Sequence, residues 1–458
     1  MALLAPGASQ AAGSVRPGAV LDPSFGVAGV LRLPSESSFT AHGTSTQSGT
    51  LLVSGGSSVQ LLNDLGGAGE AFGSIGSLTL PPATGDQFEL SGFTIDKQGR
   101  LLVVGTSLFP ESENPSPFLE NGSRAFRPGV LRILRFLPDG DLDPSFGHEG
   151  VVETGLGLPA PRGTDGRRLG SHASVVPSGV TVDAQGRIIV TGAAAVRLGE
   201  ACEHDSFAAA AVDAGFVARF TESGTPDTSF GRNGLFGGHA LSENPLGAEG
   251  IGEAIVSPGG AITYLSTGAY ACDRDRSHFG LAQLTPSGRT RTAFGKKGGI
   301  VGSYRAVAGE SDGSIVALAE VPRRREKESF TARLIRVAPG GKLDSAFGRG
   351  GRATVTLGPG FSTTLDSLAI DGRRRVIIGG TLGTPKGRSI VLLRVSGHGI
   401  WEKNFGPHGR VATRERQLGQ YGSSDLFFDP EGRLVTVHQY AEENGRSGLV
   451  VARYLPRN

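Results

Sequence analysis

A five-residue box, Phe-Gly-x-x-Gly, recurs seven times along the 458-residue chain and constrains its fold more than any other feature. The boxes begin, at intervals of about 45–85 residues, at Phe25, Phe72, Phe146, Phe230, Phe294, Phe347 and Phe405. A fixed motif at such a period indicates repeats of one supersecondary unit rather than three unrelated domains. Glycine occupies 73 positions without a Gly-x-y triplet, so the composition indicates a turn-rich β protein and excludes collagen.

A second glycine marks a turn between successive boxes, at Gly49, Gly99, Gly186, Gly260, Gly313, Gly372 and Gly432. A third glycine lies six residues before six of the phenylalanines, at Gly66, Gly140, Gly224, Gly288, Gly341 and Gly399. Apolar or alternating segments flank these turns, so each unit reads as strand, turn, strand, loop, strand, turn, box, strand. In the third unit we expect these strands at 179–183, 187–193, 215–221 and 234–238.

Four short antiparallel strands per unit are typical of a propeller blade, and the ends of the chain indicate a closed ring. The chain begins just before a box, whereas 450–456 resembles the strand that precedes a box elsewhere, at 133–138. We therefore predict an all-β, seven-bladed propeller whose last blade takes three strands from the C-terminus and one from the N-terminus. Closure removes free sheet edges. Residues 19–458 would form this single domain, preceded by a flexible leader at 1–18.

The residues of the box have structural explanations. Its aspartate, present as Asp22, Asp143, Asp227 and Asp344, can accept a hydrogen bond from a nearby backbone N–H in a turn. We expect the phenylalanine to pack between neighbouring blades and the glycines to adopt positive φ. Because the aspartate position holds Gly69, Arg291 and Glu402 in the other units, a catalytic role shared by all seven boxes is not expected, and the structural explanation is favoured.

The fullest boxes, at 21–26 and 142–147, read Leu-Asp-Pro-Ser-Phe-Gly, and this repeat resembles the delta-60 repeat family. The resemblance extends from about Val20 to the C-terminus. It implies a propeller-like fold in a bacterial, exported or surface-associated protein, and it transfers no activity and no catalytic residue. The single tryptophan, Trp401, separates the chain from quinoprotein propellers with repeated tryptophans.

Length differences between units fall in the connections after the second and fourth strands, which emerge on one face of a propeller. The largest insertions belong to the second to fourth blades, at 107–128, 156–177, 194–214, 239–250 and 269–278. Long loops on a rigid scaffold are the usual place for binding, so we expect a ligand site on this face. Neutral insertions are the alternative.

The two cysteines, Cys202 and Cys272, lie in the longest loops of adjacent blades on that face. A disulfide between them would join the two loops and would imply an oxidising compartment. Two free thiols are the alternative.

The same loops concentrate polar groups, and we name as candidate ligand-binding residues Glu203, His204, Asp205, Asp273, Asp275 and His278. Carboxylate clusters of this kind can bind Ca²⁺, although no EF-hand spacing is present. A zinc site from the histidines and cysteines is weaker, and solvated charge is the alternative. The other histidines are scattered, and those at the variable box positions, His148 and His408, are expected to be exposed.

Charge and hydropathy exclude several classes. The 45 basic and 43 acidic side chains give no reason to expect nucleic acid, and no apolar run is long enough for a transmembrane helix. The N-terminus lacks a complete signal peptide. No phosphate-binding loop or serine nucleophile elbow is present.

Three functions remain open. The first is a non-enzymatic, secreted or surface binding scaffold, expected to be monomeric, for a carbohydrate, a peptide or a cell-wall component. The second is a propeller hydrolase or lyase that uses acidic and histidine residues at the central rim, which a central carboxylate cluster with a raised pKa would favour. The third is a structural spacer module.

Overall fold

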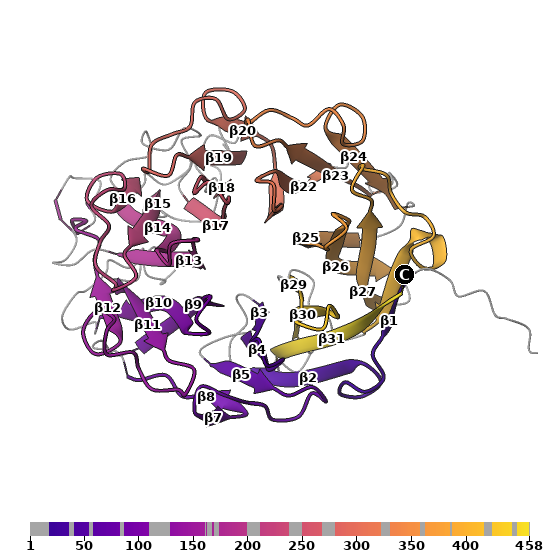
Figure 1. Ribbon diagram of the computed structural model, residues 1–458, viewed down its shortest axis with the longest axis horizontal. Helices are drawn as coiled ribbons and strands as arrows, with labels where there is room; N and C mark the ends of the chain where they lie inside the picture. Colours follow the sequence, from indigo (N-terminus) through magenta and orange to yellow (C-terminus); the bar gives the residue numbers. More distant parts are fainter. Residues whose placement is uncertain are drawn as a thin grey trace, which may run out of the picture.

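The computed structural model describes residues 18–35, 41–54, 58–82, 87–109, 129–160, 162, 167–168, 174–198, 211–237, 250–267, 280–321, 330–357, 362–384, 387–415, 424–441 and 447–457. Its strands form seven antiparallel sheets arranged as the blades of a ring (Figure 1). Within the described residues the one helical element is a short 3-10 turn, η3 (Pro407–Gly409). The predicted all-β, seven-bladed propeller is confirmed.

The blades are numbered here along the chain, and each lists its strands from the axis outward. Blade 1 consists of β3 (His42–Ser45), β4 (Leu51–Ser54), β5 (Val59–Leu62) and β8 (Ser77–Leu78), with a small hairpin β6 (Glu70–Ala71) and β7 (Ser74–Ile75) at its edge. Blade 2 consists of β9 (Gln87–Ile95), β10 (Leu101–Leu108), β11 (Gly129–Phe136) and β12 (Val151–Thr154). Blade 3 consists of β13 (Val175–Val182), β14 (Ile188–Leu198), β15 (Ala211–Phe220) and β16 (Leu235–Gly237).

Blade 4 consists of β17 (Gly250–Val256), β18 (Ile262–Thr267), β19 (Gly280–Leu284) and β20 (Gly299–Val301). Blade 5 consists of β21 (Tyr304–Gly309), β22 (Ile315–Val321), β23 (Thr331–Val337) and β24 (Arg352–Thr356). Blade 6 consists of β25 (Ser362–Ile370), β26 (Val376–Thr384), β27 (Gly387–Val395) and β28 (Arg410–Arg414). Blade 7 consists of β29 (Ser424–Phe428), β30 (Leu434–Ala441), β31 (Ser447–Arg457) and the two N-terminal strands.

The strand order expected for the third unit is confirmed, but its first three strands are longer than expected and its fourth, β16, is shorter. β14 continues to Leu198 and β15 begins at Ala211, both inside the segment interpreted as an insertion at 194–214. The hairpin continues because small alanines on both strands stay in antiparallel register, as in the pair Ala194 and Ala214. β13 likewise begins inside the segment 156–177.

Ring closure uses two N-terminal strands rather than one. β2 (Val30–Ser35) pairs with residues 447–452 of β31 as the expected outer strand. β1 (Gly18–Leu21) pairs with residues 454–457 of the same strand and extends it outward as a two-stranded ribbon. The first box lies between β1 and β2 and so belongs to blade 7.

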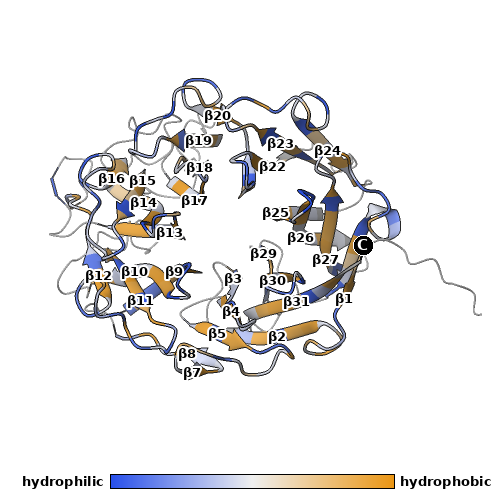
Figure 2. Cartoon of the chain, viewed as in Figure 1, coloured by the Kyte–Doolittle hydropathy of each residue, from blue (hydrophilic) through white to orange (hydrophobic). Residues whose placement is uncertain are grey.

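The core lies between adjacent blades rather than at one centre. One cluster, for example, joins Leu102 and Val104 of blade 2 to Val190 and Phe216 of blade 3. Figure 2 shows hydrophobic colour along the strands and hydrophilic colour in many of the turns, as expected for blades that bury both faces.

Each box is the joint between its own blade and the next. Phe146 of blade 2 is fully buried, and the neighbouring Gly147 N–H donates to the Ser223 carbonyl of blade 3 at 2.8 Å. Gly224 lies so close that a Cβ there would stand 2.8 Å from the Phe146 ring. The glycine six residues before a phenylalanine therefore accommodates the preceding blade's box. The prediction that the phenylalanines pack between blades is confirmed.

The box acid holds a buried arginine that precedes it by eight residues. Arg135 donates from Nε to Asp143 at 2.8 Å, and its guanidinium stacks 4.5 Å from the centre of the Phe146 ring. The same pairing recurs in Arg219–Asp227, Arg336–Asp344, Arg394–Glu402 and Arg453–Asp22. In blade 4 the arginine is at the position of the box acid, and Arg291 donates to Gln283 at the position of the arginine. In blade 1 the two positions hold Leu61 and Gly69, which cannot form such a pair. The structural role of the box acid is thus confirmed.

The positive φ expected at the box glycines is confirmed at all fourteen, and six of the seven turn glycines also have positive φ. The exception is Gly372, since Arg374 takes the left-handed conformation in blade 6, with φ 61°. Arg374 N–H donates to the Asp371 carbonyl, as Gly99 N–H donates to Asp96 in blade 2. The hydrogen bond of the turn, and not the sequence position of the glycine, selects the left-handed residue.

Candidate functional site

The site residues predicted from sequence fall outside the residues that the structure describes. This holds for both cysteines, Cys202 and Cys272, and for the polar candidates Glu203, His204, Asp205, Asp273, Asp275 and His278. Their disulfide and their ligand-binding role therefore stay predictions. Polar side chains that the sequence analysis did not single out meet instead near the axis of the ring.

The innermost strand of each blade is β3, β9, β13, β17, β21, β25 or β29 (Figure 1). Five of these strands carry a register shift against their neighbour, in β9, β13, β17, β21 and β25. In β25, for example, Asp366 is the extra residue between the paired Leu365 and Ser367. A β-bulge re-aims side chains and is common next to functional sites.

Four titratable side chains of these strands form what we call the axial cluster: His42, Glu253, Asp366 and Asp425. The first, second and fourth occupy one repeat position, four residues before the first residue of the turn that ends the innermost strand. Asp366 comes one position earlier, at the bulge. A single column of the repeat thus supplies polar groups from blades 1, 4 and 7.

Backbone and hydroxyl donors hold the two aspartates. Asp425 accepts from the Gly43 N–H of blade 1 at 2.9 Å and from its neighbour Leu426 N–H at 2.7 Å. Asp366 accepts from the Ser424 N–H at 3.2 Å and from the Ser424 hydroxyl. These bonds cross from blade 6 to 7 and from blade 7 to 1, so the carboxylates also join the inner edges of the blades.

Glu253 stands inside the ring with its side chain accessible to water. Its position inside the ring weakens the solvation of the carboxylate, and the charges of Asp425 and Asp366 disfavour a third negative charge. Together these effects raise the pKa of Glu253 to about 7. Near neutral pH this carboxyl can therefore either donate or accept a proton.

His42 provides an imidazole whose Nε2 is buried and has no hydrogen-bond partner in the described part of the chain. Burial lowers the pKa of His42, and the charge of Asp425 and a hydrogen bond with the Ser91 backbone oppose this only in part. The ring is consequently neutral at pH 7 and lies edge-on to Phe93, with ring centres 6.5 Å apart.

His42 and Glu253 line the same cavity of about 190 Å³, between the inner strands of blades 1 to 4. Its other polar walls are hydroxyls of Ser178, Thr181 and Thr191, with Phe93 as the aromatic wall. The volume is far more than one water needs, which is on the order of 10–15 Å³. This axial cavity brings together a neutral imidazole, a carboxyl whose pKa lies close to neutral pH and several hydroxyl-bearing residues.

Metal binding has no support in the described part of the chain, where no three His, Cys, Asp or Glu side chains are grouped to hold an ion. Proton transfer and hydrogen bonding are the chemistry that the axial cavity can offer. A raised carboxyl pKa beside two further carboxylates is the pattern by which enzymes separate an acid from a base.

His438 and His42 appeared in the sequence only as scattered histidines. His438 is 2% exposed, with neither ring nitrogen bonded among the described residues, and burial lowers its pKa to about 3. It pairs across the strands with Ser424, which bonds Asp366. The expected exposure of His148 and His408 is confirmed.

The axial cluster had a signal in the sequence that box-based reasoning did not use. Alignment of the seven units on the turn after the innermost strand places His42, Glu253 and Asp425 in one column. The intervals from the boxes vary too much to show this.

A family model described as a domain of unknown function (DUF5122) beta-propeller matches residues 125–146, which include β11 and end at Phe146, the first residue of the third box. No curated protein matches the chain. Among the described residues, no helix has the length and apolar character to cross a membrane.

Three solved structures are similar to the chain over most of its length. A protein of unknown function from Dyadobacter fermentans is 11% identical, with a TM-score of 0.43, and 82% of this chain and 97% of that chain are covered. Polysaccharide lyase Uly1 is 10% identical, with a TM-score of 0.47 and coverage of 98% and 94%. The PQQ-bound aldose sugar dehydrogenase of Streptomyces coelicolor is 12% identical, with a TM-score of 0.38 and coverage of 82% and 97%. Such distant likeness carries no argument about function.

Proposed function

We propose that the protein binds a small, neutral, hydroxyl-rich ligand, of the carbohydrate class, in the axial cavity. The observation that carries this proposal is that His42 of blade 1 and Glu253 of blade 4 line the same cavity, and that the buried Nε2 of His42 has no hydrogen-bond partner among the described residues. The unpartnered Nε2 of His42 needs a hydrogen-bond partner, because a buried polar atom without one costs free energy. In the neutral ring, whose other nitrogen bonds the Ser91 backbone, Nε2 is the acceptor, so a ligand hydroxyl can donate to it.

Charge and shape narrow the ligand class. Asp366 and Asp425 disfavour a third negative charge nearby, as the raised pKa of Glu253 reports, so anionic ligands are disfavoured. Hydroxyls of serine and threonine beside an aromatic ring suit a ligand with alternating polar and apolar faces. Among the partners considered from the sequence, a carbohydrate fits this lining better than a peptide or a charged cell-wall polymer.

The long loops complete the proposal. The connections after the second and fourth strands share one end of the ring, so they would frame the entrance to the axial cavity. On this face we place Glu203, His204, Asp205, Asp273, Asp275 and His278 as further ligand contacts, with calcium as an optional ion, and a Cys202–Cys272 disulfide. A secreted or surface location and membership of the delta-60 repeat family belong to the same proposal, supported by the seven boxes.

Hydrolysis or lyase cleavage is the second candidate function, and one observation favours it. Glu253, with a pKa of about 7, has the protonation behaviour of a general acid or base at neutral pH. In that role it would protonate a leaving oxygen or abstract a proton from the bound ligand, with Asp366 and Asp425 keeping its pKa high.

A glycan panel read by ligand-observed NMR tests the binding proposal. We expect wild type to bind at least one neutral saccharide, and Glu253→Gln and His42→Phe to weaken this binding at least tenfold. Glu70→Gln, on the outer hairpin of blade 1, should leave the binding unchanged. Absence of binding across the panel, or equal binding by all variants, would contradict the proposal. Release of reducing ends from the bound saccharide would decide between binding alone and catalysis.

A further inference from the structure

A cavity of about 490 Å³ lies at the ring closure between blades 6 and 7, away from the axial cavity. At the other joints a tight turn of the following blade, between its third strand and its box, lies against the box of the preceding blade. The chain's two ends interrupt blade 7 at the point where this turn would lie. In its place β1 and β31 continue as a ribbon, with Ala19 opposite Pro456.

The seventh box accordingly lacks a contact that five of the other boxes make. At five joints the first box glycine donates its N–H to a carbonyl of the next blade's turn, from Gly26, Gly147, Gly231, Gly295 and Gly348. Gly406 donates instead to Asn404 of its own box, at 2.9 Å. Arg394, 5% exposed, binds Glu402 and stacks on Phe405, but no carbonyl of blade 7 accepts from it within the described residues.

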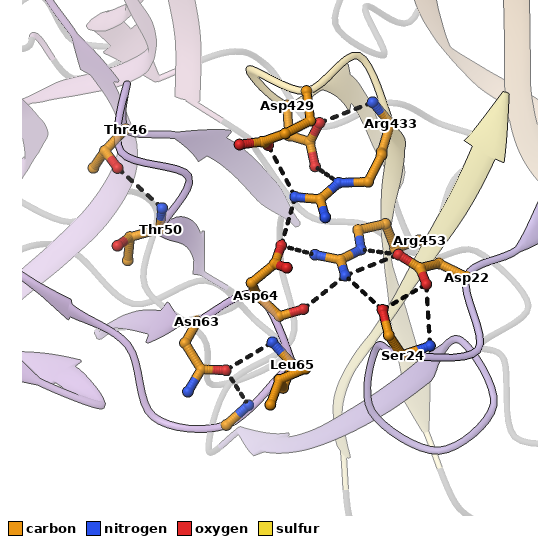
Figure 3. A network of polar contacts seen from close by, with 12 residues as sticks. Asp22, Ser24, Thr46, Thr50, Asn63, Asp64, Leu65, Asp429, Arg433 and Arg453 are labelled. Carbon is orange, nitrogen blue, oxygen red and sulfur yellow. Dashed lines mark hydrogen bonds and ion pairs between the residues drawn. The ribbon is translucent and has the colours of Figure 1, made fainter.

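The joint between blades 7 and 1 shows how a turn of the following blade binds the arginines beside a box. There the turn residue Asp64 places its carboxylate between two arginines of blade 7, at 2.6 Å from Arg433 and 2.8 Å from Arg453 (Figure 3). Its backbone carbonyl accepts from Arg453 at 2.6 Å.

A second joint, between blades 2 and 3, uses the same arrangement. Glu222 of the turn binds Arg100 at 2.8 Å, and its carbonyl accepts from Arg135. In both turns a glycine follows the acidic residue by two positions and packs against the box: Gly66 after Asp64, and Gly224 after Glu222.

In the described part of the chain, the cavity between blades 6 and 7 presents two arginines at the same positions, with no acidic turn residue between them. Arg375 binds Asp371 at 2.6 Å, as Arg433 binds Asp429, and Arg394 occupies the place of Arg453. Both line the cavity, together with Phe405. The same pair of arginines faces an acidic turn at two other joints, those of Asp64 and Glu222, whereas in blade 3 Arg219 donates to the carbonyl of Pro286.

We call this cavity between blades 6 and 7, lined by Arg375, Arg394 and Phe405, the seam socket. We propose that the seam socket binds an acidic turn, Glu/Asp-x-Gly, of another protein. The turn's carboxylate lies between Arg375 and Arg394, its carbonyl accepts from Arg394, and its glycine covers Phe405. Charge-assisted contacts with two arginines provide the affinity, and the glycine provides specificity because a Cβ at this position would strike the phenylalanine ring. The socket is independent of the axial cavity.

A peptide copied from the chain's own blade 3 turn, residues 220–226, is the direct probe. Labelled and cyclised, it should bind the full-length protein saturably in fluorescence anisotropy. The peptide with Glu222→Gln should bind at least tenfold more weakly, and the peptide with Gly224→Ala should show no binding.

Matched protein variants separate the socket from general effects on stability. Arg375→Gln should weaken peptide binding at least tenfold. Arg187→Gln removes the corresponding arginine of blade 3, which binds Asp183 in the same way, and should not change binding. Melting curves of both variants establish that they are folded. Equal loss in both variants, or no saturable binding by wild type, would overturn the proposal. Binding seen only after removal of residues 1–17 would also overturn it, since the chain's own leader would then be the occupant.

Discussion

Glu253 is the residue at which the electrostatics of the axial cluster can be measured directly. Its pKa is raised to about 7, so between about pH 4.5 and 7 the folded protein binds this proton more tightly than the unfolded chain does. The free energy of unfolding contributed by this group is therefore fully present at low pH and is lost as the pH rises through 7.

Glu253→Gln removes this dependence, because glutamine does not ionise. We expect the melting temperature of the variant, relative to wild type, to be higher at pH 8 than at pH 4.5. Glu70→Gln is the control for loss of a glutamate far from the axis. An offset from wild type that is the same at both pH values would contradict the assignment.

The arginine–acid pair of the box offers a second test at the residue scale. Arg219 is 2% exposed, and Arg219→Leu leaves Asp227 with only the more distant Arg187, at 3.9 Å, which should cost about 3 kcal/mol of unfolding free energy. The double variant Arg219→Leu/Asp227→Gly reproduces the pair found in blade 1 and should recover part of that loss. Urea denaturation measures all three proteins, with the exposed Arg349→Leu as control. A double variant as unstable as the sum of its single changes would show that the two residues do not act as a pair.

The sequence predicts the box acid but not its arginine, for a physical reason. Aspartate next to proline or serine in a turn has a local explanation, whereas Arg135 lies eight residues earlier within a strand and resembles an outward-facing residue. The axial cluster is hidden in a similar way. A bulge such as that at Asp366 shifts the phase of alternation, so side-chain direction cannot be counted from the strand ends.

At the scale of the element, the turn glycines set how closely blades approach. Gly224 has a φ of +86°, and a Cβ would stand 2.8 Å from the Phe146 ring. Gly224→Ala should therefore lower the free energy of unfolding by about 1–3 kcal/mol, through backbone strain and displacement of the ring. Gly259→Ala, at a turn position with no atom within 4 Å, is the matched control. Thermal denaturation that gave equal losses for both would show that the joint does not depend on this contact.

The two longest loops of blades 3 and 4 carry the prediction of a disulfide. If Cys202 and Cys272 are bonded, the unfolded protein without reductant should take up no iodoacetamide, and two equivalents after reduction. Mass spectrometry counts the added groups. Uptake of two equivalents before reduction would show free thiols and remove the support for an oxidising compartment.

Elements were predicted better in order than in extent. The order of strands in the third unit followed from turn glycines and apolar runs, which are local signals. The extension of β14 and β15 depends on whether two alanine-rich segments remain paired, which single-strand patterns do not show. The left-handed Arg374 was missed for the same reason, since a hydrogen bond across the turn determines it.

At the scale of the whole molecule, the ends of the chain predicted ring closure because each end lacked what the other supplied. The second N-terminal strand and the seam socket were not predictable in this way. Both follow from replacement of a tight turn by the ribbon of β1 and β31, which is a property of how two distant segments meet. Asp22 nevertheless reaches Arg453 across this break at 2.9 Å, so the joint itself is complete.

A circular permutant tests both the closure and the socket. Leu455 is joined to Val20 through Glu-Ser-Gly, which copies the blade 3 turn at the seam, and new ends are placed between β22 and β23. We expect the new turn to lie against Phe405 and its glutamate to bind Arg375. The peptide 220–226 should then no longer bind. The reference is a permutant with the same ends in which 458 and 18 are joined by about 20 flexible Gly/Ser residues.

The permutant with the tight turn should be the more stable of the two. Shortening the closing loop from about 20 to 3 residues saves about 1–2 kcal/mol of loop-closure entropy, and the contacts of the turn add to this. The urea concentrations at the unfolding midpoint can be compared directly, because both permutants lack residues 1–17 and have the same new chain ends between β22 and β23. Because the new chain ends affect both permutants alike, equal midpoints together with retained peptide binding would mean that the Glu-Ser-Gly turn does not enter the seam socket. A higher midpoint for the permutant with the tight turn, together with loss of peptide binding, would show that the same site accepts either the chain's own turn, which stabilises the ring, or the turn of another chain.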